Sequence, residues 1–140
     1  MGTGTEKRAS IHSLARQKAV SRRVLIVEDN LDSVHSMATL VRLMGHEVQF
    51  AINGFAALDI ARRFRPEIIL LDIALPDFKG YNIARQLKWE PDLQSTRIIA
   101  ITGQPMDQVR QKALDAGCEE VFAKSIDPQV LEELLARSDA

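Results

Sequence analysis

The chain has 140 residues, with 18 lysine and arginine residues against 19 aspartate and glutamate residues, so its formal net charge is −1. Hydrophobic residues make up 46% and charged residues 26% of the sequence, a balance that excludes a wholly disordered, collagen-like or membrane-spanning chain. Because the net charge provides no general attraction to nucleic acid or to anionic membranes, we expect neither direct nucleic-acid binding nor membrane insertion.

The first 22 residues differ from the rest of the chain because they are basic and rich in small polar residues. Cations at positions 7, 8, 16, 18 and 22 face a single acid, Glu6. Apolar residues at positions 11, 14 and 15 have helical spacing, but this stripe is too narrow to fold alone. We therefore expect residues 1–22 to be a flexible tail, or a tail with a short helix over residues 10–19 that docks on a partner. The segment lacks the apolar run of a signal peptide, which predicts a cytoplasmic protein.

From residue 23 to residue 140, apolar runs alternate with helical patterns, which is typical of a parallel sheet covered by helices on both faces. Short apolar runs predict strands at residues 24–27, 48–50, 68–73, 98–101 and 121–123. Apolar residues three and four apart predict helices at residues 34–44, 55–64, 83–87, 106–116 and 127–135. Because such connections are right-handed crossovers, we expect an α/β fold: a doubly wound five-stranded parallel sheet with the flavodoxin-like order 2-1-3-4-5.

Several residues mark where the predicted helices begin and end. Gly45 suits the position just after the first helix, where the left-handed conformation is common. Asp127 is a suitable N-cap for the last helix, and Pro128 suits its first position. The helix at residues 106–116 has the thinnest apolar stripe, so we expect it to be the least firmly packed.

Polar side chains follow the predicted strands at the edge of the sheet where their carboxyl ends meet. Glu28 and Asp29 follow the first strand, and Asp72 lies near the end of the third. Thr102 follows the fourth strand, and Lys124 follows the fifth. In doubly wound sheets ligands bind at this edge, near the point where the strand order reverses. Three neighbouring carboxylates need a compensating cation, and their oxygen atoms favour Mg²⁺. The ammonium of Lys124 and the hydroxyl of Thr102 suit a phosphoryl group.

These residues and their spacing resemble the receiver domain of two-component response regulators. Thr102 follows Asp72 by 30 residues, and Lys124 follows Thr102 by 22, as in that family. Pro76 and Gly80, four and eight positions after the aspartate, match it as well. The resemblance covers about residues 22–137. We therefore expect the chain from residue 23 to residue 140 to be a receiver domain, either a stand-alone regulator or part of a larger protein such as a hybrid sensor kinase.

The resemblance implies a role for each acidic residue. Asp72 is the phosphoacceptor, and it also binds the metal ion. Asp29 is a direct ligand of Mg²⁺, and the backbone carbonyl of Ala74 completes the protein ligands. Glu28 acts on the metal either directly or through a water molecule. The domain is then expected to catalyse its own phosphorylation and dephosphorylation, without being a classical turnover enzyme.

The resemblance also implies partners and an output surface. The phosphoryl group comes from a histidine kinase or a histidine phosphotransfer protein. Thr102 bonds a phosphoryl oxygen, and Lys124 pairs with the phosphoryl group or, before transfer, with Asp72. A downstream protein is expected to bind the face made by the fourth helix, the fifth strand and the fifth helix, which are the predicted elements at residues 106–116, 121–123 and 127–135.

Two other functions share part of this pattern. A receiver-shaped module can signal through protein contacts that do not depend on phosphorylation, and this alternative stays open. A phosphatase of the haloacid dehalogenase type also uses an aspartate at a strand end, but it needs a second acid two residues later. Position 74 is alanine in this chain, which argues against the phosphatase.

Three positions depart from the family pattern. Val121 stands where an aromatic residue is often found, with Phe122 one place later. Ser125 stands where proline is frequent, and Gly103 stands where alanine is common. Because a cis peptide bond before a residue other than proline costs about 3 kcal/mol, we expect a trans bond before Ser125. Without a large ring at position 121, output is expected through loop movement and repositioning of the helix at residues 106–116.

Overall fold

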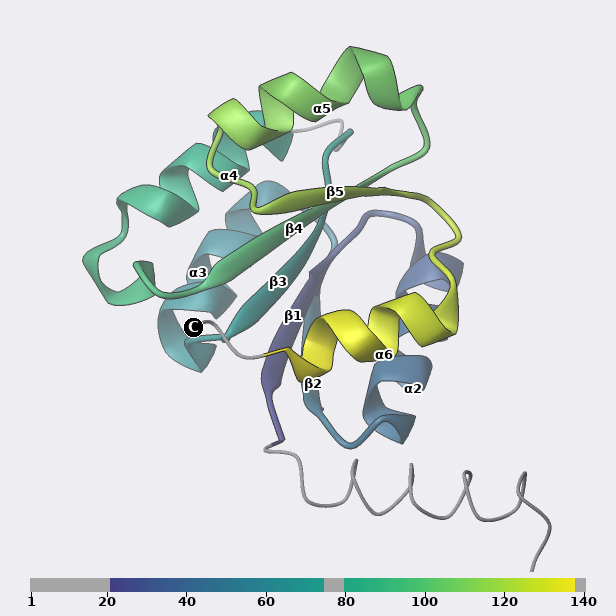
Figure 1. Ribbon diagram of the computed structural model, residues 1–140. Helices are drawn as coiled ribbons and strands as arrows, with labels where there is room; N and C mark the ends of the chain where they lie inside the picture. Colours follow the sequence, from purple (N-terminus) through teal and green to yellow (C-terminus); the bar gives the residue numbers. More distant parts are fainter. Residues whose placement is uncertain (1–20, 75–79, 138–140) are drawn as a thin grey trace, which may run out of the picture.

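The computed structural model describes residues 21–74 and 80–137. In these ranges five parallel strands form one sheet, in the order β2-β1-β3-β4-β5. Helices α3, α4 and α5 cover one face of the sheet, and α2 and α6 cover the other (Figure 1). The predicted doubly wound architecture is therefore confirmed. The tail helix expected over residues 10–19 and the loop residue Pro76 lie outside the described residues.

Each strand and helix predicted after residue 23 is present, with ends that differ by a few residues. The strands are β1 (Arg23–Val27), β2 (Glu47–Ala51), β3 (Ile68–Asp72), β4 (Arg97–Thr102) and β5 (Glu120–Ala123). The helices are α2 (Leu31–Leu43), α3 (Gly54–Phe64), α4 (Gly80–Trp89), α5 (Met106–Asp115) and α6 (Pro128–Ala136). A short 3₁₀ helix, η1 (Pro91–Leu93), was not predicted. No helix in the described part of the chain is long and apolar enough to span a membrane.

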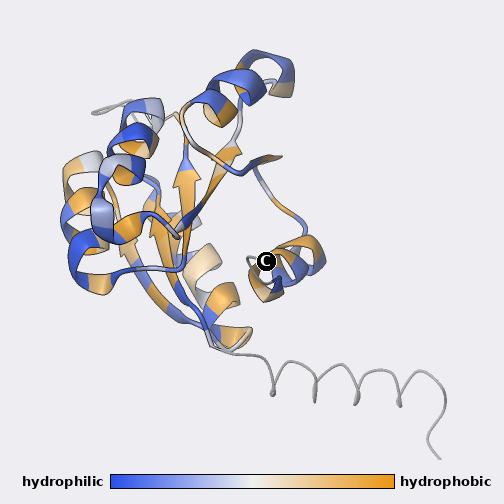
Figure 2. Cartoon of the chain, turned by 60° about the vertical axis from the view of Figure 1, so that its left-hand side comes forward, coloured by the Kyte–Doolittle hydropathy of each residue, from blue (hydrophilic) through white to orange (hydrophobic). Residues whose placement is uncertain are grey.

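The core consists of two apolar layers, one on each face of the sheet. Successive strand residues point to opposite faces, so alternate residues of one strand belong to different layers. In β1, Leu25 packs under α3 and α4, whereas Ile26 packs under α2 and α6. All residues of β3 and β4 are buried, because both strands are covered on both faces. Figure 2 shows this arrangement as apolar strands between helices whose outer sides are hydrophilic.

The helix ends follow the signals in the sequence. The side chain of Asp127 accepts hydrogen bonds from the backbone N–H groups of Gln129 and Val130, so the predicted N-cap of α6 is confirmed. Gly45 follows α2 with φ +98°, a left-handed conformation that favours glycine.

Helix α5 has the fewest buried residues of the five α-helices in the described ranges. It buries Val109 and Ala113, whereas each of the other four buries at least three residues. The side chain of Val121 in β5 is buried in the layer under α5, and Phe122 lies half-buried in the opposite layer. The α5 side therefore has no aromatic ring at position 121, as the sequence indicated.

Ion pairs and hydrogen bonds join the chain at the amino edge of the sheet, opposite the strand ends that carry the polar residues. Arg22 Nε donates a hydrogen bond to the carbonyl oxygen of Leu135 at 2.7 Å, and Arg22 Nη1 lies 3.4 Å from Glu67 Oε2. The buried Arg97 donates to both carboxylate oxygens of Glu119, with Nε 3.0 Å from Oε1 and Nη2 2.9 Å from Oε2. Arg22, the residue just before β1, therefore contacts the end of α6.

Candidate functional site

Three carboxylates meet at the carboxyl edge of the sheet. Glu28 and Asp29 follow β1, and Asp72 is the last residue of β3, the strand next to β1. One oxygen atom from each residue lies within 4.8 Å of the others, so the group could hold a metal ion. Glu28 and Asp72 are buried, whereas Asp29 is exposed. The convergence expected from the strand ends is therefore present in the structure.

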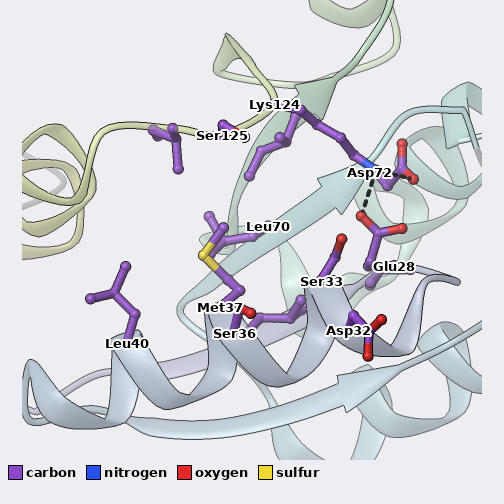
Figure 3. Close-up of a pocket in the computed structure, with 14 residues that line it drawn as sticks. Glu28, Asp32, Ser33, Ser36, Met37, Leu40, Leu70, Asp72, Lys124 and Ser125 are labelled. Carbon is purple, nitrogen blue, oxygen red and sulfur yellow. Dashed lines mark hydrogen bonds and ion pairs between the residues drawn. The ribbon is translucent and has the colours of Figure 1, made fainter.

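Lys124 reaches this group from the edge strand β5. Its ammonium lies 2.7 Å from Glu28 Oε1 and 3.3 Å from Asp72 Oδ2 (Figure 3). Partial burial lowers the pKa of Lys124, but the bonds to Glu28 and Asp72 outweigh this effect, so the pKa is raised overall. The lysine thus remains a cation between two buried carboxylates.

Backbone N–H groups hold two of the predicted reactive side chains. The N–H of Ala74 donates to Asp72 Oδ1 at 3.0 Å, and the N–H of Gln104 donates to Thr102 Oγ1 at 2.9 Å. In each case the donor lies two residues after the side chain that it orients. Thr102 is fully buried, and its carbonyl oxygen accepts the N–H of Lys124 at 2.7 Å. Both side-chain oxygen atoms are therefore oriented by backbone N–H groups just after the ends of β3 and β4.

The electrostatics of the site favour a bound cation. Partial desolvation raises the pKa of the Asp29 carboxyl, and its interactions with Glu28 raise it further. The lysine compensates only part of the charge of three carboxylates. Oxygen ligands of this kind fit a hard divalent cation, and the cluster contains no histidine or cysteine of the kind that zinc prefers.

A close backbone contact joins the residue after β3 to the start of α4. Gly80 begins α4, and its N–H donates to the carbonyl oxygen of Ile73 at 3.2 Å. A Cβ atom at position 80 would lie 2.5 Å from the backbone of Ile73, which is too close for any other residue without a shift. Sequence analysis identified Gly80 by its spacing from Asp72, but only the structure shows why a glycine stands there.

The turn from β5 to α6 has an unusual backbone conformation at Ser125. No peptide bond in the described residues is cis, so the bond before Ser125 is trans as predicted. Ser125 has φ +61°, a left-handed conformation that residues other than glycine rarely adopt. At Gly103 an added Cβ would meet only Lys124 Cδ at 3.8 Å, so this position has room for the alanine common in the family.

Asn30 is a site residue that sequence analysis missed. Its backbone N–H donates to Glu28 Oε2 at 3.1 Å, and its side chain accepts the N–H of Ser33 as the N-cap of α2. Asn30 therefore connects the acidic loop to the start of α2. An asparagine two residues after a strand-end acid, just before a helical pattern, was the available signal.

Comparisons with known proteins agree with this geometry. The family model of the response regulator receiver domain matches residues 24–136. The polar-differentiation response regulator DivK of Brucella anthropi is 34% identical over 114 residues, which cover 81% of this chain and 93% of that protein.

Two solved structures have the same architecture. The chemotaxis response regulator CheY4 of Vibrio cholerae has a TM-score of 0.77 at 22% identity, covering 83% of this chain and 97% of its own, which shows the fold alone. The receiver domain of sensor histidine kinase PA1611 from Pseudomonas aeruginosa PAO1 has a TM-score of 0.76 at 28% identity, covering 83% of this chain and 95% of its own. That structure has a magnesium ion coordinated in its active site cleft.

Proposed function

The chain belongs to the response regulator receiver domain family of two-component signalling, and we propose that it is a phosphoacceptor switch. It takes a phosphoryl group from a histidine kinase or a histidine phosphotransfer protein onto Asp72, in a reaction that depends on Mg²⁺. One observation carries this proposal: the Asp72 carboxylate lies among two further carboxylates and a lysine ammonium at the carboxyl edge of the sheet.

The proposed transfer needs few covalent steps from the protein. An oxygen atom of the Asp72 carboxylate forms a bond to phosphorus as the bond between phosphorus and the donor histidine nitrogen breaks. The phosphorylated side chain carries a charge of about −1.5 to −2 in place of the single negative charge of the carboxylate. Lys124 can then exchange a carboxylate partner for a phosphoryl oxygen, and Thr102 can donate its hydroxyl hydrogen, because the hydroxyl oxygen accepts the Gln104 N–H without using that hydrogen.

The donor set supports Mg²⁺ as the metal. In our proposal Asp29, Asp72 and the carbonyl of Ala74 are the protein ligands, and Glu28 acts directly or through water. Mg²⁺ usually takes one or two carboxylates and keeps several water molecules, which fits a cluster at the open edge of a sheet. When bound, the ion supplies positive charge to the phosphoryl oxygens.

A phosphoryl analogue tests the proposal directly. Addition of beryllofluoride and Mg²⁺ should change the ¹H–¹⁵N NMR spectrum of the wild-type protein. The change should be absent in Asp72→Asn and retained in Asp59→Asn, a matched control on the exposed side of α3. The same change in Asp72→Asn, or none in the wild type, would contradict the switch and favour signalling that does not depend on phosphorylation.

We further propose that a downstream protein binds the face made by α5, β5 and α6. Thr102 ends β4, directly before α5, and Lys124 connects β5 to α6, so both residues lie beside this face. The shallow packing of α5, with two buried residues, supports a helix that can be repositioned. The same proposal includes a cytoplasmic location for the protein. It also divides the chain into a tail at residues 1–22 and a receiver domain at residues 23–140.

A further inference from the structure

A cavity of about 390 Å³ lies between α2 and the connection from β5 to α6, and it opens beside Asp72. Leu70 lies on the sheet side of the cavity, and Met37 and Leu40 of α2 form one wall (Figure 3). Ile26 and Ile101, on the same face of the sheet as Leu70, also line it. All five side chains are apolar. Transfer of a phosphoryl group to an aspartate has no use for such an apolar recess, so the proposed function leaves it unexplained.

No residue of the described helix α6 lines the cavity, and its lining on that side is the connection at residues 124–126. The buried residues of α6 are Leu131, Leu134 and Leu135, which lie in the second half of the helix. Residues 128–130, in its first turn, are all exposed. The left-handed turn at Ser125 leads the chain from β5 into α6, and only Ile126 of that connection packs on this layer. The start of α6 therefore leaves a space between α2 and residues 124–126, above sheet side chains that are themselves only 1–7% exposed.

The open end of the cavity is acidic. Glu28, Asp32 and Asp72 line it, and Lys124 is the one cation among its lining residues in the described part of the chain. Lys124 already contacts Glu28 and Asp72, whereas Asp32 lies exposed in the first turn of α2. The positive end of the α2 dipole contributes only about half a unit charge. The net charge at this end is therefore negative.

We propose that the cavity binds a small amphipathic cation, with its apolar body against the half-buried Met37 and Leu40 of α2 and its ammonium group among the carboxylates. The volume lies within the range of about 300–1,000 Å³ that is usual for small-molecule sites, and such sites combine an apolar lining with a few polar groups. A ligand in this position lies against Lys124 and the carboxylates proposed to hold the metal ion. Its binding therefore opposes metal binding and links the switch to a second chemical signal.

Three probes of equal chain length test the charge preference: n-hexylammonium, 1-hexanol and hexanoate. Binding is followed through the methyl NMR signals of Ile26, Leu70 and Ile101, which line the cavity. We expect hexylammonium to bind about tenfold more tightly than hexanol, because one additional ionic contact at a partly buried site readily supplies that factor, and hexanoate to bind most weakly. Equal affinities for the ammonium and the alcohol would overturn the proposal. No phosphoryl analogue is used, so the result is independent of the test of phosphorylation.

Variants on α2 test the position of the ligand. Ser36→Leu places a larger side chain in the cavity and should abolish the shifts caused by all three probes. Thr39→Leu, an exposed position on the same helix that does not line the cavity, should leave them unchanged. Asp32→Asn should weaken binding of hexylammonium severalfold and leave hexanol unaffected. Full binding in Ser36→Leu, or equal losses for both probes in Asp32→Asn, would overturn the proposed site.

Discussion

Lys124 and Glu28 form an ion pair of 2.7 Å, and this contact is shorter than the 3.3 Å between Lys124 and Asp72. The lysine that is proposed to bind the phosphoryl group therefore lies closer to a proposed metal-site carboxylate than to the phosphoacceptor. A bound Mg²⁺ ion would compete with the ammonium for the negative charge of Glu28 and Asp72. Phosphorylation of Asp72 would then allow Lys124 to leave Glu28 and pair with a phosphoryl oxygen.

This contact predicts opposite effects for two substitutions on Mg²⁺ affinity. Lys124→Met removes the competing cation, so Mg²⁺ should bind more tightly, and Glu28→Gln removes a carboxylate, so binding should weaken. We expect the dissociation constant for Mg²⁺ to change about tenfold in each variant. This change corresponds to only a modest part of the interaction energy between unit charges about 4 Å apart near a protein surface. Isothermal titration calorimetry measures both constants. A shift of the two variants in the same direction would contradict the assignment.

The same Mg²⁺ titration tests whether Asp29 is a ligand of the metal ion. Asp29→Asn should weaken Mg²⁺ binding by about tenfold or more, because a carboxylate ligand is replaced by a neutral amide. Asp107→Asn, at an exposed position in the first turn of α5, serves as the control with the same change of charge. Unchanged affinity in Asp29→Asn would remove this residue from the ligand set.

Amide hydrogen exchange should locate the output face. With beryllofluoride and Mg²⁺, we expect the largest changes in α5, β5 and α6, because Thr102 and Lys124 connect directly to them. Such a change reflects a shift of an existing equilibrium. Changes confined to α3 and α4 would show that the output face lies elsewhere.

The phosphorylated state should be long-lived. Ala74 and Gln104 are both exposed at the site, but alanine offers no group to orient an attacking water molecule, and glutamine is neutral. The double variant Ala74→Asn with Gln104→Glu should therefore lose the phosphoryl group of Asp72 faster. The measurement follows the loss of a labelled phosphoryl group from Asp72 over time in the wild type and in the double variant. Equal or slower loss in the double variant would count against the idea.

Two glycine substitutions should differ in stability. Gly80→Ala forces a Cβ to within 2.5 Å of the Ile73 backbone, so it should lower the unfolding free energy by about 1–3 kcal/mol. Gly103→Ala meets only the flexible side chain of Lys124 at 3.8 Å and should have little effect. Urea denaturation of both variants tests this difference. Equal stabilities would mean that the start of α4 can move away from Ile73 freely.

The thiol of Cys118 should be unreactive in the folded protein. Burial raises its pKa from 9.0 to about 11, with a smaller opposing effect of Lys88. Its alkylation by iodoacetamide at pH 8 should be slow until urea unfolds the chain. The thiol ionises at a lower pH in the unfolded chain than in the folded protein. The stabilisation of the folded protein by the protonated, buried thiol is therefore complete below pH 9 and is lost as the pH rises towards 11. Equal alkylation rates with and without urea would contradict this burial.

Local patterns in the sequence determined the secondary structure and the composition of the site. Apolar runs at β3 and β4 predict buried strands, because a strand covered on both faces has no polar side. Asp127 and Gly45 marked helix ends through interactions with their own neighbours. The helix η1 was missed because three residues are too few for a periodic pattern. Glu28, Asp29 and Asp72 were predicted to meet because the carboxyl ends of parallel strands share one edge.

The tertiary structure alone decided how these groups contact one another. The preference of Lys124 for Glu28 depends on the spacing of β1 and β5 and on the reach of two side chains 96 residues apart in the chain. The approach of Gly80 to Ile73 and the cavity beside α6 depend on how helices pack against the sheet. Sequence periodicity specifies which side of a helix is apolar. How much of the sheet that side covers depends on the backbone at the connecting turn, here the left-handed Ser125, and on contacts distant in sequence.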